Sequence, residues 1–183
     1  MTSASTTGDD LVRRELFLPT PEGEGRLLLL IDAFTGPTKS LEGRTKLAKL
    51  DFLLRYPSYF RRALLIRAPE ASAPEPEASE ANIEQRMVRF RYGPWDPAYF
   101  ALLGSLIGRG LVEPVSVSSG VGYRSTESGS ALAARLRDVE VWADTGMRAR
   151  LLRRHFDLSG STLKDFVYEH FPEVSSTAWG DVL

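Results

Sequence analysis

The stretch that decides the fold is residues 95–136, WDPAYFALLGSLIGRGLVEPVSVSSGVGYRSTESGSALAARL. Its first part predicts a helix, because Asp96 can cap free backbone N–H groups and Pro97 suits the first helical turn. Leucine and isoleucine then recur at helical spacing and give this helix one buried face. Gly108 and Gly110 permit the left-handed conformation in which many helices end, so they predict the end of this one.

The second part of the stretch predicts a hairpin and a further helix. Residues 111–115 and 121–125 have strand composition, and the Ser-Ser-Gly of residues 118–120 predicts the turn between them. Thr126 is a good N-cap for the helix that carries the next leucines. A helix, a hairpin and a second helix in this order predict a winged helix-turn-helix, within a fold that is mainly α with a small β-wing.

Further helices are predicted on both sides of this stretch. Residues 25–34 form a nearly continuous apolar run, typical of a buried helix, although periodicity alone also permits a core strand. Residues 41–56 predict a helix that Pro57 ends or kinks, and a short helix follows it. After the hairpin, residues 126–156 are mostly helical with a break near residues 144–146, and the final helix covers residues 161–171 and closes at Pro172. The alternation in residues 87–92 predicts a strand beside the wing.

These elements suit one domain with a helical extension. We expect a leader at residues 1–22, a winged-helix domain at 23–136 and C-terminal helices at 137–174. A tail is expected at residues 175–183. Residues 68–84 predict a mobile loop inside the domain, because their Pro, Ala and Glu cannot bury enough apolar surface to offset the chain entropy.

Composition narrows the class of protein. The 183 residues include no cysteine, which excludes disulfides, zinc fingers and thiol catalysis. No apolar run is long enough to cross a bilayer, and no secretory signal is recognisable, so we expect a cytoplasmic protein. Removing the five glutamates of residues 68–84 changes the net charge from −1 to +4. A mildly basic body is compatible with phosphate contact but does not by itself indicate a nucleic-acid binder.

Six residues are candidates for contact with double-stranded DNA. Three arginines lie on one edge of the strand expected at residues 87–92, and the others lie on the helix of residues 97–109, at its end, and on the hairpin. The candidates are Arg86, Arg89, Arg91, Tyr99, Arg109 and Arg124. Arginines in such a group would contact phosphates without reading sequence. The alternative is that the three strand arginines pair with the preceding glutamates or only solvate an edge strand.

The helix of residues 97–109 is poorly equipped to read bases. Its expected outward positions are Ala98, Tyr99, Ser105 and Arg109, whereas base reading uses Arg, Lys, Asn or Gln at groove edges. A structural or protein-contacting helix is therefore the favoured interpretation.

A second basic run surrounds two leucines further along the chain. It predicts either a partner-facing helix or an ordinary amphipathic one, and the residues that would contact a partner are Arg150, Leu151, Arg153 and Arg154. Arg44, Lys46 and Lys49 predict a solvated helix face rather than phosphate anchors. The two histidines have no metal-ligand spacing, and no phosphate loop or nucleophile elbow occurs, so neither a metal, a cofactor nor catalysis is expected.

Four segments resemble a known family. They are LLLIDAF, LEGRTKLAKLDFLLRYPSYF, RYGPWDPAYFALLGSLIGRGLVE and FDLSGSTLKDFVYEHFPEV, and together they cover most of residues 25–174. They are similar to the winged-helix middle components of bacterial ABC-three-component systems, relatives of Lamassu-type defence modules. More generally, GRGLVEPV and GYRSTESGSAL are similar to PadR- and MarR-type regulators.

The resemblance implies a non-enzymatic adaptor subunit. Such a subunit joins an SMC-like or ABC-type ATPase to an effector, both encoded nearby, in an anti-phage complex, with any DNA contact directed at the backbone. The alternative is a dimeric PadR/MarR-like transcription regulator with residues 97–109 in the DNA groove and Arg124 on the wing. Neither function involves a small-molecule substrate or a membrane.

Overall fold

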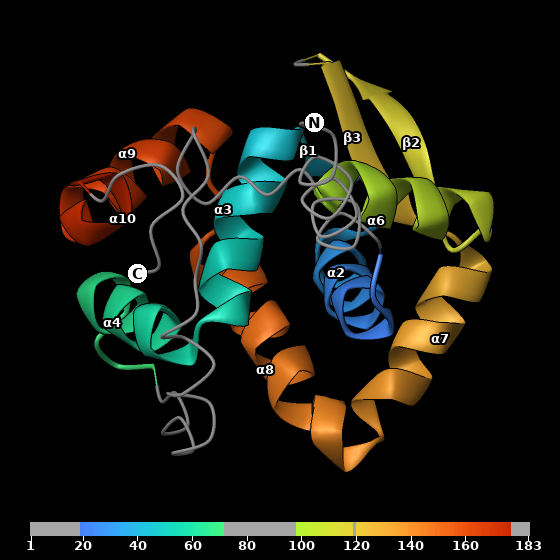
Figure 1. The fold of residues 1–183 in the computed structure, drawn as a ribbon, viewed down its shortest axis with the longest axis horizontal. Helices are drawn as coiled ribbons and strands as arrows, with labels where there is room; N and C mark the ends of the chain where they lie inside the picture. Colours follow the sequence, from blue (N-terminus) through green and yellow to red (C-terminus); the bar gives the residue numbers. More distant parts are fainter. Residues whose placement is uncertain (1–18, 72–97, 119, 177–183) are drawn as a thin grey trace, which may run out of the picture.

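The structure is a computed structural model that describes residues 19–71, 98–118 and 120–176 (Figure 1). The part of the chain that it describes is mainly helical, with a small antiparallel sheet. The helices are α2 (Pro21–Phe34), α3 (Arg44–Arg55), α4 (Pro57–Arg67), α6 (Ala98–Gly108), α7 (Glu127–Arg137), α8 (Glu140–His155), α9 (Gly160–His170) and α10 (Pro172–Ser176). The strands are β1 (Leu41–Glu42), β2 (Val112–Val117) and β3 (Gly120–Ser125).

The sheet has the order β1-β3-β2, with both pairs antiparallel. The predicted hairpin is confirmed, because β2 pairs with β3 along its whole length, from Val112 opposite Ser125 to Val117 opposite Gly120. The third strand was not predicted. Residues 41 and 42 were expected to begin a helix, but Leu41 pairs with Tyr123 and α3 begins only at Arg44.

Helix α2 lies at the centre of the molecule. Helices α7 and α8 form a V in Figure 1, and α2 lies between its two arms. Its apolar run from Leu27 to Ile31 is fully buried because α3, α6, α7, α8 and β3 all pack around it. The predicted buried helix is confirmed, and it begins at Pro21 with Thr20 as its N-cap.

One polar residue of this helix ties three elements together. The carboxylate of Asp32 accepts hydrogen bonds from the hydroxyls of Ser125 on β3 and Ser130 on α7, at 2.8 and 2.7 Å. Its other oxygen lies 2.8 Å from Arg137 Nη1. A partly buried carboxylate with three donors is well compensated, so this cluster fixes the hairpin and α7 against α2.

The C-terminal helices share the core of the N-terminal ones. Leu152, Phe156, Leu163, Val167 and Phe171 belong to the same buried cluster as the leucines of α2 and α3. The rings of Phe52 and Phe171 lie 6.4 Å apart, which joins α3 to the end of α9. The segment expected as an extension therefore contributes to the core that the remaining helices use.

The structure differs from the sequence prediction at two places in the C-terminal helices. The break expected near residues 144–146 lies instead at Asp138 and Val139, between α7 and α8, and α8 is continuous to His155. The helix expected at residues 161–171 is confirmed as α9, which ends before Pro172 as predicted, but it is not the last helix, because Pro172 is the first residue of α10. Proline lacks only a donor that the first helical turn does not need, so it starts a helix as readily as it ends one.

Candidate interaction surfaces

Helix α6 presents a different face from the one expected. Tyr99 is only 4% exposed and Ala98 is also buried, so the expectation that both face outward is wrong. Leu102, Leu103 and Leu106 complete the buried face. Beyond the helix, Gly110 has φ of +68°, the left-handed conformation predicted for the stop at this position.

Tyr99 is buried because its hydroxyl has a partner in the core. Tyr99 Oη donates to Asp51 Oδ2 at 2.8 Å, and Arg26 donates to both oxygens of Asp51, at 2.7 and 3.1 Å. Burial alone would lower the pKa of Arg26, but the charge and hydrogen bonds of Asp51 raise it above its usual value. The phenol therefore links α6 to α2 and α3, and Tyr99 is not available for DNA contact.

The arginine that follows α6 is held by an acidic residue of α2. Arg109 Nη1 lies 2.7 Å from Glu24 Oε2, and the hydroxyl of Ser105 also donates to Glu24. Both expected outward positions near the end of α6 are therefore engaged by one carboxylate.

The wing arginine is paired in the same way. Arg124 on β3 donates through Nε and Nη2 to Glu113 Oε1 on β2, at 3.0 and 2.6 Å. The other three candidates for DNA contact, Arg86, Arg89 and Arg91, lie outside the described residues, as does the strand expected at residues 87–92.

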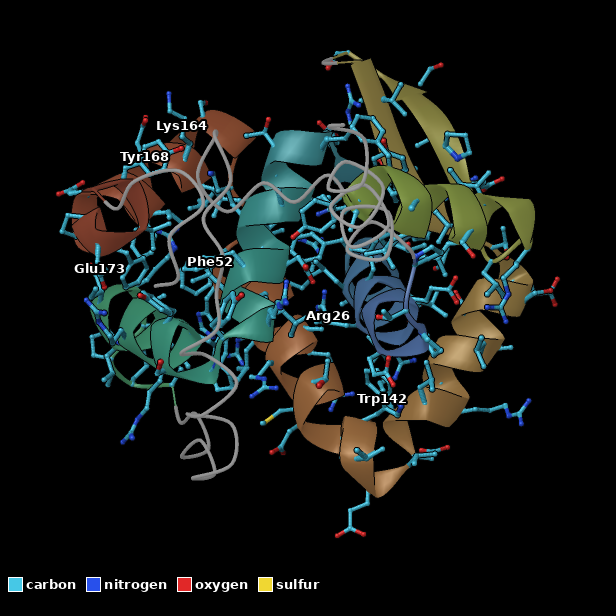
Figure 2. The ribbon with its side chains drawn as sticks, viewed as in Figure 1. Arg26, Phe52, Trp142, Lys164, Tyr168 and Glu173 are labelled. Carbon is cyan, nitrogen blue, oxygen red and sulfur yellow. The ribbon has the colours of Figure 1, made fainter. Side chains whose placement is uncertain are left out.

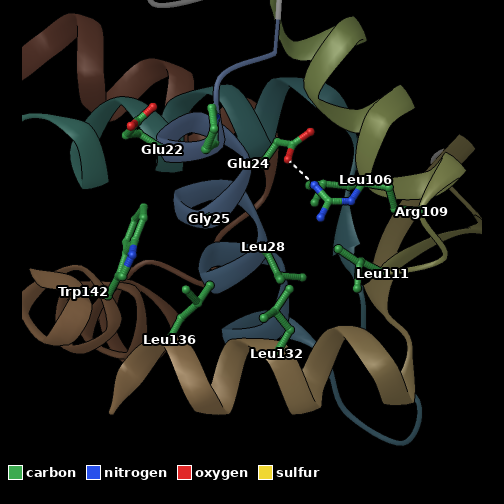
Figure 3. Close-up of a pocket in the computed structure, with 11 residues that line it drawn as sticks. Glu22, Glu24, Gly25, Leu28, Leu106, Arg109, Leu111, Leu132, Leu136 and Trp142 are labelled. Atoms are coloured by element: carbon green, nitrogen blue, oxygen red, sulfur yellow. Dashed lines mark hydrogen bonds and ion pairs between the residues drawn. The ribbon is translucent and has the colours of Figure 1, made fainter. Parts of the chain in front are cut away.

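Beside Arg109 lies a groove with a volume of about 350 Å³ between α2, α6, α7 and α8 (Figure 3). Its floor is apolar, and carboxylates stand at the α2 end. The floor residues are Leu28, Leu106, Leu111, Leu132, Leu136 and Trp142. Glu22 is exposed at the rim, whereas Glu24 is held by Arg109. An apolar floor with a few polar groups at the rim is typical of a binding groove.

Trp142 closes one side of this groove, and the sequence analysis did not single it out. A Cβ at Gly25 would lie 2.8 Å from the indole, so the ring packs directly against the α2 backbone. Next to it, the corner between α7 and α8 leaves Val139 and Val141 exposed, Val141 at 77%. The small residue at position 25, one turn into a buried helix, was the signal in the sequence that a large side chain approaches there.

The residues expected to contact a partner on α8 lie in different environments. Arg150 is exposed, whereas Leu151 is partly buried and packs against the core. Leu151 and Arg154 line a second cavity, of about 330 Å³, with His155 and Glu70. Arg153 pairs with Asp157 and lies over the ring of Phe34, with 5.5 Å between its guanidinium carbon and the ring centroid.

The basic residues at the start of α3 are not a solvated face. Lys46 and Lys49 are both buried, so that expectation is wrong for these two residues. Lys46 Nζ lies 2.6 Å from Asp157 Oδ1. Burial of Asp157 favours its protonated form, but the hydrogen bonds and charges of Lys46 and Arg153 outweigh this and lower the pKa of Asp157.

Lys49 has a different environment. Its Nζ lies 3.5 Å from Tyr168 Oη, at the outer limit of a hydrogen bond, and 4.8 Å from the centroid of that ring. Burial, together with the charge of Lys164, lowers the pKa of Lys49 to about 8. The partner of Lys49 is thus an aromatic side chain, whereas that of Lys46 is a carboxylate.

Within the ranges that the structure describes, no three His, Asp or Glu side chains are grouped closely enough to hold a metal ion. None of the described helices combines the length and apolar character needed to cross a membrane.

Comparisons with family models, with curated proteins and with solved structures found no match to this chain.

Proposed function

We propose that this protein is a non-catalytic winged-helix adaptor subunit that joins an ATPase and an effector in a bacterial anti-phage complex. The order of elements supports the winged helix. In the part of the chain that the structure describes, β1 lies between α2 and α3, α6 precedes the hairpin, and the strand order is β1-β3-β2. This order is compatible with a winged helix, in which α4 would be an additional helix between α3 and α6.

The main support for the adaptor function is that the basic side chains at the end of α6 and on the wing form ion pairs within the chain. Arg109 and Arg124 are both paired with glutamates of the same chain, and Tyr99 is buried. Each glutamate offsets the charge of its arginine and so weakens the attraction of these two groups for phosphate. Base reading from α6 would lack the side chains that normally perform it.

The neighbouring groove supports protein binding. The groove has an apolar floor with Glu22 exposed at its rim, and the corner between α7 and α8, next to Trp142 in sequence, exposes Val139 and Val141. Exposed apolar surface of this kind often marks a protein-binding site. The occupant that fits is an amphipathic segment of a partner subunit, with apolar side chains on the floor and a basic side chain against Glu22.

The test is co-expression with the products of the adjacent genes, followed by capture of the tagged full chain. We expect an ATPase subunit to be captured by the wild type, and the substitutions Glu22→Lys and Val141→Asp to reduce capture at least tenfold. Val121→Asp is the matched control, because Val121 is an exposed valine on the wing, at 50%. Equal capture by all variants would contradict the groove as the docking site.

The alternative is a dimeric transcription regulator. Measuring the oligomeric state and the DNA affinity of the protein alone distinguishes it from the adaptor. A regulator dimerises and binds its own promoter far more tightly than bulk DNA. The adaptor is expected to bind duplex DNA weakly and with equal affinity for all sequences, if it binds DNA at all.

A further inference from the structure

Three buried charged side chains on α3 are treated differently by the fold. Asp51 is contacted by Arg26 and Tyr99, and Lys46 is paired with Asp157. Lys49 is 4% exposed, and no described carboxylate pairs with it. A buried ammonium without a counter-ion is unfavourable, so its presence calls for an explanation other than packing.

The groups around Lys49 add positive charge rather than neutralising it. Helix α9 packs against α3 and carries Lys164 and Tyr168, one turn apart on the same side (Figure 2). The hydroxyl and ring of Tyr168 hold the Lys49 ammonium, and Lys164 is exposed beside them. Asp165 and Glu169 are exposed neighbours in sequence, but successive residues of a helix do not face the same way.

We propose that Lys49, Lys164 and Tyr168 form a binding site for a terminal phosphate group. Two ammonium groups carry a charge of +2, and a phosphate monoester carries about −1.5 to −2 at neutral pH, so the charges match. A carboxylate, with one charge, would leave one lysine uncompensated. Lysine is a compact point charge that suits a phosphate oxygen.

The phosphate must be terminal because Lys49 is nearly inaccessible. A phosphodiester in a nucleic-acid backbone is flanked by two sugars and could not approach a side chain that is 4% exposed. A monoester presents three oxygens on a projecting group, which reach Lys49 while Lys164 contacts them from the surface. Tyr168 acts as a positioning residue, since its ring and hydroxyl fix the direction of the Lys49 ammonium.

Inorganic phosphate is the first probe, added to the full chain at pH 7.5, with sodium chloride at equal ionic strength as the reference. We expect phosphate to raise the melting temperature more than chloride does. It should also raise the pKa of Lys49, followed by NMR of the lysine side chains, from about 8 towards the usual 10.5. No change in this pKa on adding phosphate would overturn the proposal.

The variants separate this site from general salt effects. Lys49→Met should weaken phosphate binding at least tenfold, and Lys164→Met should weaken it severalfold. Lys39→Met is the matched control, because Lys39 is an exposed lysine of the turn before β1. If the Lys49→Met protein keeps the full response to phosphate, the site is elsewhere and the proposal is wrong. Lys49→Met should fold, because it removes a buried charge.

A second set of probes distinguishes the sources of the phosphate. A nucleoside 5′-monophosphate and a 5′-phosphorylated oligonucleotide are compared with their unphosphorylated forms. Binding that requires the terminal phosphate supports the site, whereas equal binding of the unphosphorylated forms contradicts it. The site does not depend on the adaptor function, so failure of either leaves the other standing.

Discussion

Two sides of α3 show two environments for a buried charge in this fold. At the α2 and α6 side, Asp51 is 1% exposed and receives three hydrogen bonds, two from Arg26 and one from Tyr99. At the α9 side, Lys49 is almost as deeply buried, yet it meets an aromatic ring and another lysine. A buried charge that has ionic and hydrogen-bond partners contributes to the stability of the fold. A buried charge without a counter-ion does not, so its presence indicates a role other than stability.

The largest change in stability is expected from removing the charge of Asp51. Asp51→Asn leaves the Arg26 guanidinium buried without its counter-charge, and we expect a loss of about 3 to 5 kcal/mol in the free energy of unfolding. Urea denaturation measures it. Adding Arg26→Met in the same chain should recover most of the loss, because the unpaired guanidinium beside position 51 is then removed. A double variant as unstable as the single one would show that packing, and not the charge, explains the effect.

Removing the charge of Lys49, on the α9 side of α3, should change stability in the opposite direction. At pH 7, Lys49→Met should stabilise the protein by about 2 to 3 kcal/mol, because the folded state no longer holds a charged lysine whose pKa is lowered to about 8. The wild type binds fewer protons at this site when folded than when unfolded between pH 8 and pH 10.5. Its stability should therefore rise across that window. Urea denaturation at pH 7 and pH 10 should show the advantage of Lys49→Met shrinking to below about 1 kcal/mol. Equal advantage at both pH values would contradict the lowered pKa.

A smaller loss of stability is expected from removing the hydroxyl of Tyr99. Tyr99→Phe removes only the hydroxyl that donates to Asp51, so a loss of about 1 to 2 kcal/mol is expected. Because the ring is buried, the affinity for duplex DNA should stay unchanged, which fluorescence anisotropy can measure. A variant of wild-type stability that loses DNA binding would restore Tyr99 as a contact residue.

The smallest effect is expected at the surface. Arg124→Ala breaks an ion pair between two partly exposed side chains, 36% and 44% for Arg124 and Glu113, and should change stability by less than about 1 kcal/mol. Thermal unfolding checks this value. A clear loss would mean that the pair fixes the hairpin, and the contrast between buried and exposed charges would then be less sharp than we propose.

Much of the fold could be predicted from local patterns. The apolar run of α2, the cap at Thr126 and the hairpin up to Ser125 follow from residues close in sequence. The strand at Leu41 could not be predicted, because two residues carry no period of their own and become a strand only when β3 offers its edge. The break at Asp138 was missed for a similar reason, since a glycine at position 146 looked the better breaker, yet it serves the close packing of Arg137.

The candidate sites divide in the same way. The sequence identified Arg109 and Arg124, but it could not show that Glu24 and Glu113 hold them. It placed Lys49 on a solvated face, because a lysine at that spacing usually is solvated. Trp142 received no attention, because only the crossing of α8 over α2 brings it to Gly25 and to the groove.

What the sequence by itself determined is the set of elements with a local cause: the helices, their caps where a side chain reaches its own backbone, and the hairpin with its turn. The tertiary structure alone decided which charges are neutralised, because the partners of Asp51, Asp32 and Lys46 come from elements 25 or more residues away. Helical periodicity shows which face of a helix is apolar. Whether a buried charge contacts a carboxylate, an aromatic ring or another basic side chain depends on the helix packed against it.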